Sequence, residues 1–131
     1  MDFESDLLSS LEKFAGELKI DAAFFMALGA VKKAAFAYYE QAAKRYVEEV
    51  VDEPMELLSC LGNIATLEGK VVVHAHAVFS DKSGRLRGGH LLKETTVFAG
   101  EVLIFELSGI ELPRTYDSIT GLNLYTPKPK P

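Results

Sequence analysis

A nine-residue run, VVVHAHAVF at Val71–Phe79, places two histidines inside an otherwise apolar segment. Side chains alternate between the two faces of a strand, so His74 and His76 share one face with Val72 and Val78, and the opposite face is entirely apolar. A buried imidazole without a partner costs about 1–3 kcal/mol, so each ring must hydrogen-bond, bind a metal or face a wet cavity. We expect the apolar face to pack on a helix and the histidine face to be covered by a second subunit.

The turn that follows this run brings the third histidine of the chain to the same face. A polar, glycine-containing loop at 81–85 closes the next hairpin, and symmetric closure sets His76 opposite His90. Directly opposed Cβ atoms lie about 5 Å apart and diagonal ones about 7–8 Å, which is within reach of one ion. The sequence therefore predicts that His74, His76 and His90 line one pocket.

The preceding turn fixes the register on the other side. A two-residue turn at 68–69 pairs Asn63 with His74. Asn63 is therefore predicted to contact the histidines without itself being a metal ligand. The same register sets Cys60, the only cysteine, opposite Ala77 on the core face, where we expect it to pack rather than to bind metal or catalyse. A single cysteine also excludes an intrachain disulfide.

Three neutral imidazoles without a fourth protein ligand form a pattern that suits zinc or a similar divalent ion, with one position open for water or a small ligand. Such an ion lowers the pKa of its bound water to about 7, so hydrolytic or lyase chemistry stays open. Glu101 is the candidate general base, although most strand carboxylates are simply exposed. The competing interpretation is that the three rings only hydrogen-bond in a polar crevice or at a subunit interface, and the residues alone leave both open.

Hydrophobic periodicity predicts one helix followed by a series of strands. Apolar residues recur at helical spacing over residues 5–18, and an Ala- and Phe-rich segment at 22–31 is predicted to be a strand. Residues 35–51 fit either a helix or a hairpin around a polar turn at 41–44, and the period alone does not decide. Turn signals then separate four strands, for which we predict an antiparallel meander: Met55–Leu67, Lys70–Ser80, Leu86–Leu92 and Thr96–Leu107.

The length and charge of the chain narrow the possible classes of protein. Its 131 residues predict a single domain at 1–125, followed by a Pro- and Lys-rich flexible tail at 126–131. No apolar run reaches the ~18 residues of a membrane span, and the acidic residues after Met1 do not resemble a secretory signal, so we expect no membrane partner and a cytoplasmic location. The net charge of −5 opposes binding to nucleic acid, and Arg85 and Arg87, the best candidates for a basic patch, are interpreted as solvated hairpin charges.

A further set of motifs is distributed over nearly the whole chain. It comprises the run GNIATLEGKVVVHAHAVFSDKSGRLRGGHLL, the run TVFAGEVLIFELSG, and shorter matches at Gly29-Ala30, Tyr38-Tyr39, Glu56-Leu57-Leu58-Ser59, Gly62-Asn63, His74-x-His76, Gly88-Gly89-His90-Leu91, Glu101-Val102, Tyr116-Asp117 and Thr120-Gly121-Leu122. In this combination the chain resembles the PPC domain, the plants-and-prokaryotes-conserved domain that is also found beside AT-hooks in plant nuclear proteins.

The resemblance implies an α+β fold, with a mostly antiparallel sheet flanked by helices, assembled as a homotrimer. It also implies a hairpin for residues 35–51, and it places the family's metal-type histidine cluster on His74, His76 and His90. Prokaryotic members of this type usually carry the label of DNA-binding proteins. Plant relatives contact partner proteins through a segment that here consists of Pro54, Met55, Glu56, Leu57, Leu58 and Ser59.

The sequence departs from the family pattern in two places. Family members normally begin with an extra strand before the helix, whereas this sequence starts almost directly on the helix, which is expected to leave one sheet edge exposed. The sequence also contains no AT-hook, the element that reads the minor groove, and this weakens the analogy with the plant proteins.

Two functions from different classes follow from these observations. The first is a non-enzymatic homotrimeric module, DNA-associated and regulatory, that holds a divalent metal of the zinc type on its three histidines. The alternative is a metal-dependent enzyme that uses a metal-bound water on a small polar substrate, with Glu101 or Asn63 assisting. We favour the first interpretation.

Overall fold

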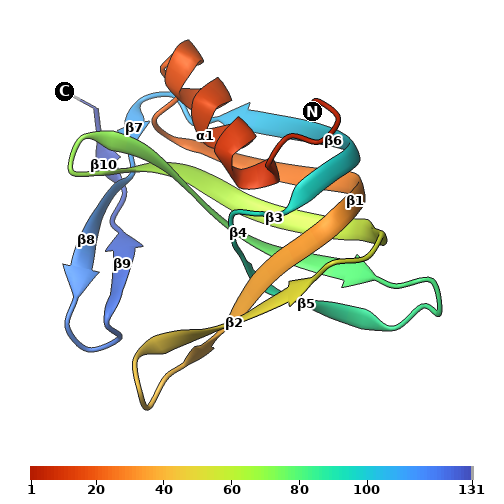
Figure 1. Cartoon of the computed structure of the whole chain (residues 1–131). Coiled ribbons are helices and arrows are strands. Elements are labelled where there is room, and N and C mark those ends of the chain that lie inside the picture. The colour runs from red at the N-terminus through yellow and green to blue at the C-terminus, as the bar shows by residue number, and fades with distance from the viewer. Residues whose placement is uncertain (131) are drawn as a thin grey trace.

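The computed structural model describes residues 1–130, which form one helix and ten strands (Figure 1). The fold is mostly β, and a single helix is present in this part of the chain where flanking helices were expected. None of the described residues belongs to a helix long and apolar enough to cross a membrane. The bounds of the elements are α1 Leu7–Leu18, β1 Ala23–Glu40, β2 Arg45–Val51, β3 Met55–Leu67, β4 Lys70–Ser80, β5 Leu86–Leu91, β6 Thr96–Glu106, β7 Ile110–Glu111, β8 Pro113–Asp117, β9 Leu122–Tyr125 and β10 Lys128–Pro129.

Helix α1 forms where the sequence predicted it and lies over one face of the sheet (Figure 1). The Asp6 carboxylate caps its first turn by accepting a hydrogen bond from the backbone N–H of Ser9 at 2.7 Å. Lys19 ends the helix in the left-handed conformation. The apolar face of β4 packs toward this helix, as predicted. The stripe of the helix that is buried consists of Leu7, Leu8, Leu11 and Ala15.

The last four predicted strands are present almost residue for residue, whereas the strand predicted at 22–31 is the first half of a longer strand, β1. β3 and β4 have the predicted bounds, and β5 and β6 each end one residue earlier than predicted. The segment at 35–51 is a hairpin, because its first arm is the second half of the 18-residue strand β1 and its second arm is β2. The polar turn at 41–44 joins the two arms, with Glu40 opposite Arg45.

Strand β1 pairs with four other strands and thereby closes a ring. Its first half lies between β3 and β6, and its second half pairs with β2 and β5. Since β3, β4 and β5 also pair in order, the strands β1, β3, β4 and β5 close on one another. The predicted meander is therefore wrong at its last step: the free edge of β5 pairs with β1, and β6 pairs with the first half of β1 instead.

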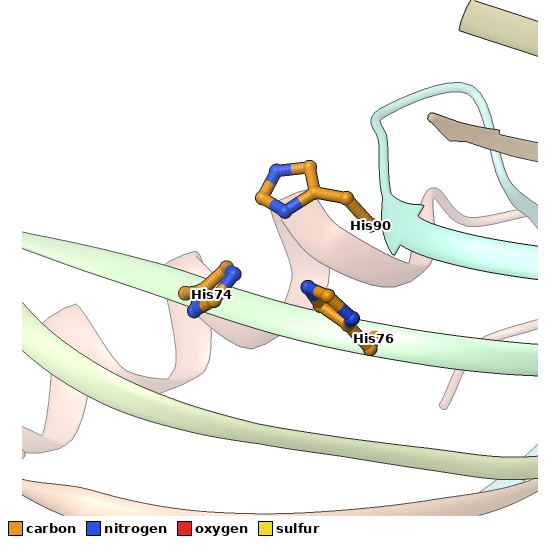
Figure 2. Close-up of side chains that lie close together, drawn as sticks. All are labelled: His74, His76 and His90. Carbon is orange, nitrogen blue, oxygen red and sulfur yellow. The ribbon is translucent and has the colours of Figure 1, made fainter. Parts of the chain in front are cut away.

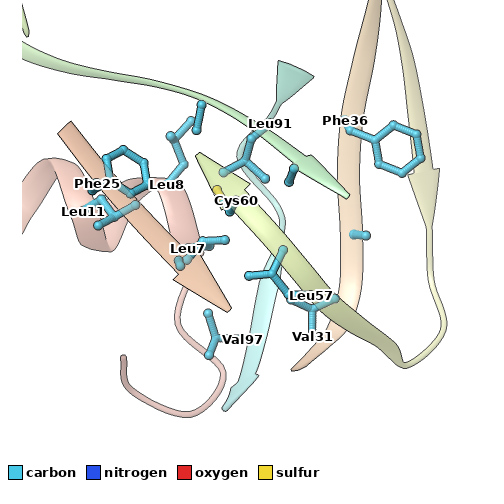
Figure 3. Close-up of a cluster of buried hydrophobic side chains, with 14 of the residues drawn as sticks. Leu7, Leu8, Leu11, Phe25, Val31, Phe36, Leu57, Cys60, Leu91 and Val97 are labelled. Atoms are coloured by element: carbon cyan, nitrogen blue, oxygen red, sulfur yellow. The ribbon is translucent and has the colours of Figure 1, made fainter. Parts of the chain in front are cut away.

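The hydrophobic core fills the space between this ring and α1 (Figure 3). Phe25, Phe79, Ile64 and Cys60 have no exposed surface. Cys60 lies opposite Ala77, as predicted, and burial raises the pKa of its thiol to about 12. The thiol therefore stays protonated and serves as a packing group.

The segment before α1 lies along the start of β6. The N–H of Glu4 donates to the carbonyl oxygen of Val97 at 2.8 Å, and the N–H of Val97 donates to the carbonyl oxygen of Ser5 at 2.9 Å. Asp6 forms a further bridge with Thr96. The sheet edge that was expected to be exposed is thus covered over its first residues.

The last described residues, within the segment at 126–131 that was predicted to be a tail, return to the domain. β10 pairs with β7, and the N–H of Lys130 donates to the carbonyl oxygen of Gly109 at 2.9 Å. The Lys130 ammonium also pairs with Asp21 at 3.0 Å. Pro129 has no N–H to donate, but at the edge of a sheet it needs none. Pro131 lies outside the described residues.

Candidate metal centre

Three histidines lie on one face of β4 and β5, as the turn lengths predicted (Figure 2). His76 is directly opposite His90, and Asn63 on β3 is directly opposite His74. The ring centroids are 5.2 Å apart for His74 and His76, 4.9 Å for His74 and His90, and 5.6 Å for His76 and His90. The three side chains therefore converge from two neighbouring strands.

Each histidine can offer one ring nitrogen to a common centre, because these nitrogen atoms all lie within 4.8 Å of one another. Zinc–nitrogen bonds of about 2.1 Å place tetrahedral ligand nitrogens about 3.4 Å apart, so a shift of about 1 Å completes the geometry. Among the described residues, no Cys, Asp or Glu joins the group. A metal ion held here would therefore keep one coordination position open.

The histidines are also electrostatically suited to a metal ion. Burial lowers the pKa of His74 and that of His90 to about 4, so both imidazoles are neutral near pH 7 and keep a lone pair. The Nδ1 atom of His90 is buried and has no hydrogen-bond partner within residues 1–130. A metal ion would satisfy such an orphaned acceptor, so these residues fit a divalent ion. His76 differs from the other two because it is exposed in the single chain.

Strand β2 adds an aromatic wall beside His90. The ring of Tyr46 lies 4.6 Å from that of His90 with an angle of 31° between the planes, and 5.0 Å from the ring of Tyr39. Burial raises the pKa of the Tyr46 hydroxyl, so the phenol is neutral near pH 7. The tyrosine thus limits the orientations that the His90 ring can adopt.

Two glycines let β5 lie close to both of its neighbours. A Cβ atom on Gly88 would lie 2.0 Å from the carbonyl oxygen of Ala77, and one on Gly89 would lie 2.5 Å from the carbonyl oxygen of Ala37. Any larger residue would push β5 away from β4 or β1. The glycine pair thus sets the position of His90 by close backbone approach.

Strand β8 brings an arginine to the same site. β8 runs parallel to β3, with Arg114 opposite Leu67. The Nη2 of Arg114 donates to the Oδ1 of Asn63 at 2.6 Å, and its Nη1 donates to the carbonyl oxygen of Asn123 at 2.8 Å. Asn63, which was predicted to support the histidines, lies opposite His74 but hydrogen-bonds to Arg114.

A cavity of about 730 Å³ lies in front of these side chains. His74, His90, Asn63 and Arg114 line it, together with Tyr46, and no Asp or Glu of the described residues contributes to its wall. Sequence reasoning missed Arg114 and Tyr46. Arg114 had no local signal, because no turn connects β3 to β8, and Tyr46 lies in the segment whose periodicity fitted both a helix and a hairpin.

Glu101 is not brought to the histidines within the chain. It lies on β6 opposite Leu28, and its side chain is exposed. It lines a different hollow, together with Leu28 and Leu103. That hollow shares no residue with the cavity in front of His74 and His90.

An exposed apolar surface reaches the histidines across the sheet. One row of directly opposed residues crosses five strands in the order Leu103, Met26, Leu61, His76 and His90. Leu103 is 60% exposed, Met26 40% and Leu61 48%. Soluble proteins seldom leave a large contiguous apolar surface exposed. We define the apolar face as Phe24, Met26, Leu28, Leu58, Leu61, Val78, Leu103 and Phe105, all of which are exposed.

The two arginines that were considered for a basic patch are both paired. Arg85 contacts Asp81 at 2.8 Å, and Arg87 contacts Glu49 at 2.6 Å. These pairs agree with the interpretation of Arg85 and Arg87 as hairpin charges, because each positive charge is matched by a neighbouring carboxylate.

Comparison with known proteins gives a family match and several structural matches. The Plants and Prokaryotes Conserved (PCC) domain matches residues 1–108. A metal-containing protein of Archaeoglobus fulgidus is 39% identical, with a TM-score of 0.91 over 96% of this chain and 89% of that chain. A plant- and prokaryote-conserved (PPC) protein of Pyrococcus horikoshii is 28% identical, with a TM-score of 0.91 over 96% of this chain and 87% of that chain. A protein of Ralstonia eutropha JMP134, provisionally described as DNA-binding, is 28% identical, with a TM-score of 0.87 over 96% of this chain and 87% of that chain. No curated protein matches the chain.

Proposed function

This chain belongs to the Plants and Prokaryotes Conserved (PCC) domain family, and on that premise we propose that it is a homotrimeric module that holds a divalent metal ion on His74, His76 and His90. The observation that carries the proposal is the convergence of three ring nitrogens within 4.8 Å of one another. The similar protein of Archaeoglobus fulgidus is described as metal-containing, which supports it. Zinc is the ion that we propose, because three imidazoles and one open position suit it.

In this proposal, residues around the site hold the histidine ligands in position. Tyr46 packs on His90 and limits its rotation, and Gly89 keeps the strand that carries His90 close to β1. When bound, the ion supplies a Lewis-acidic centre at the wall of the cavity. His76 is the one ligand that the chain leaves exposed, so its cover must come from another molecule.

The apolar face supports assembly with further copies of the chain. Its side chains are exposed in the single chain, and burying apolar surface contributes about 25 cal/mol per Å². The row that joins Leu103 to Leu61 continues into His76, so a neighbouring copy on this face would also cover that histidine. Leu58, from the segment Pro54–Ser59 that was predicted to contact partner proteins, belongs to the same face. We therefore propose another copy of the chain as the partner of that segment.

Metal analysis tests the proposal directly. Protein purified without a polyhistidine tag and incubated with zinc should retain about one ion per chain after desalting, as expected for one three-histidine site. His74→Ala and His90→Ala should lose it. Cys60→Ala should retain it, because Cys60 is buried in the core away from the site. Wild-type protein that retains no zinc, nickel, cobalt or manganese would overturn the metal proposal.

The family resemblance also led us to expect a regulatory, DNA-associated role. It is supported by the description of the Ralstonia eutropha relative. The net charge of −5 and the pairing of Arg85 and Arg87 with carboxylates oppose it. We expect no binding to duplex DNA at about 150 mM salt. Binding that weakens with rising salt, and whose salt dependence falls in Arg85→Ala/Arg87→Ala, would establish the role.

A metal-dependent enzyme that acts on a small polar substrate is the alternative function. The observation that favours it is the cavity of about 730 Å³ beside the histidines, a size typical of small-molecule sites. Glu101 is not a wall residue of this cavity, whereas Asn63 and Tyr46 are. An enzyme of this kind should lose turnover in His74→Ala and keep it in Glu101→Gln.

A further inference from the structure

Arg114 is a half-buried arginine without a carboxylate partner. The other three arginines, Arg45, Arg85 and Arg87, each pair with a carboxylate, whereas none of the ion pairs among residues 1–130 includes Arg114. An arginine has five N–H groups. One hydrogen on Nη2 is donated to Asn63 and one on Nη1 to a backbone carbonyl, and the Nε is buried and has no partner within the described residues. A buried charged donor of this kind normally has a partner.

The cavity offers nothing that could neutralise this charge. Its wall consists of apolar, histidine, asparagine, tyrosine and glycine residues besides Arg114, and none of the described wall residues is acidic. The guanidinium lies over the ring of Tyr125, with its carbon 5.5 Å from the ring centroid, a cation–π contact. The Nε is closed to solvent, so the donors left for a ligand are the free N–H groups on Nη1 and Nη2. A guanidinium suits a carboxylate or a phosphate, and such a group in the cavity would supply the negative charge that the wall lacks.

Arg114 and the histidines face the same space. The guanidinium is hydrogen-bonded at 2.6 Å to Asn63, which is directly opposite His74 in the sheet, and both line the cavity with His90. A metal ion on the histidines would add a second positive centre with an open position. The two centres together favour a ligand that is negative at one end and has an oxygen or nitrogen donor at the other.

We propose that the cavity binds a small organic anion, with a carboxylate or phosphate group on the guanidinium of Arg114 and its other end toward the three-histidine metal site. The orientation toward the metal site rests on the proposed metal function, whereas the binding of the anion to Arg114 does not. Succinate and inorganic phosphate are suitable probes, because each presents one of the two groups and neither strips a metal as strongly as a chelator.

The test is calorimetric titration of both probes into metal-free and cobalt-loaded protein. At least one probe should bind wild type, and Arg114→Gln should weaken that binding about tenfold or more in both metal states. Arg45→Gln, which removes an exposed charge paired with Glu40, should bind like wild type. The visible spectrum of the cobalt form should change when the bound probe is added, since the anion reaches the open coordination position. If one probe binds more tightly than the other, the group it carries, carboxylate or phosphate, is the one that Arg114 recognises.

The outcomes separate this proposal from the metal proposal. If the protein binds no metal but Arg114→Gln still loses the probe, the anion site stands and the metal function falls. If metal binds and neither probe binds wild type, or Arg114→Gln binds the probe as tightly as wild type, the anion site falls alone. Arg114→Lys guards against misfolding: it keeps the charge but lacks the planar guanidinium, so its affinity should lie between those of wild type and Arg114→Gln.

Discussion

Leu61 lies directly opposite His76 in the register of β3 and β4, so the exposed apolar face and the histidine cluster share one row of the sheet. Leu61 is 48% exposed, and His76 is the exposed member of the three histidines. Any molecule that covers Leu61 therefore covers this histidine as well. Assembly and metal retention are expected to depend on each other for this reason.

Leu103→Glu is expected to turn the proposed trimer into single chains of 14.4 kDa, because a charge at the far end of the row cannot be desolvated in an interface. Size-exclusion chromatography with light scattering measures the mass. Zinc affinity should also fall in the same variant, although Leu103 does not contact the histidines, because the copy proposed to cover His76 would be lost. Ile119→Glu, in an exposed turn between β8 and β9, should remain trimeric. A wild type that is a single chain would contradict this prediction.

Removal of the metal is expected to lower the melting temperature by several degrees. A ligand present at about 100 times its Kd stabilises the folded state by about 2.7 kcal/mol, and the chelator abolishes that contribution. Differential scanning calorimetry with and without a chelator measures the shift. His90→Ala should melt at the same temperature in both conditions. Equal melting temperatures for wild type would mean that no ion links β4 to β5.

Gly89→Ala is expected to lower the free energy of unfolding by about 1–3 kcal/mol, because the new Cβ would lie 2.5 Å from a backbone oxygen of β1. Urea denaturation measures the loss. The matched control is Gly16→Ala in α1, where no atom lies within 4 Å of the new Cβ, and there we expect a gain of about 0.5–1 kcal/mol. Stability unchanged in Gly89→Ala would show that β5 can move away from β1 at no cost.

The loop at 81–85 is expected to make stability depend on pH through Asp81. Its carboxylate accepts hydrogen bonds from the Ser83 hydroxyl at 2.6 Å and the Ser83 N–H at 2.8 Å, and the hydroxyl bond in particular holds the pKa of Asp81 well below its usual range. An ionised group with a depressed pKa stabilises the fold above its unfolded pKa of about 3.9, and that contribution is lost as the pH falls further. The gap in melting temperature between wild type and Asp81→Asn should therefore be constant from pH 5 to pH 8 and narrow below pH 4.

A matched variant for this pH dependence is Ser83→Ala, which removes the hydroxyl that donates to the Asp81 carboxylate at 2.6 Å. Its melting temperature should lie between those of wild type and Asp81→Asn from pH 5 to pH 8, because the N–H groups of Ser83 and Arg85 still donate to the carboxylate. A gap between wild type and Asp81→Asn that stays constant down to pH 2 would show that the hydrogen bonds persist in the protonated form.

The histidine cluster could be predicted from the sequence because it depends on local geometry. A two-residue turn and a five-residue loop set the registers of β3 with β4 and of β4 with β5, and these registers place His76 opposite His90 and Cys60 opposite Ala77. Turn length is visible in a sequence, so each of these pairs follows from counting residues.

Other parts of the site depend on pairings that no turn specifies. β1 pairs with β5 and β6, and β8 pairs with β3, across long stretches of chain. Arg114 reaches the cavity only through the last of these pairings, and Glu101 is carried away from it by the pairing of β6 with β1. Such contacts are chosen by the packing of the whole domain, which a single sequence does not reveal.

The dependence of β1 on distant partners also bears on how the chain folds. Ala23, at the start of β1, ends up opposite both Ile64 and Glu106, so this strand cannot complete its hydrogen bonds until Glu106 has been synthesised. Proteins dominated by such non-local contacts fold in milliseconds to seconds rather than microseconds. During that interval β1 has free edges on both sides, and newly made chains at high concentration are most prone to join wrongly through them.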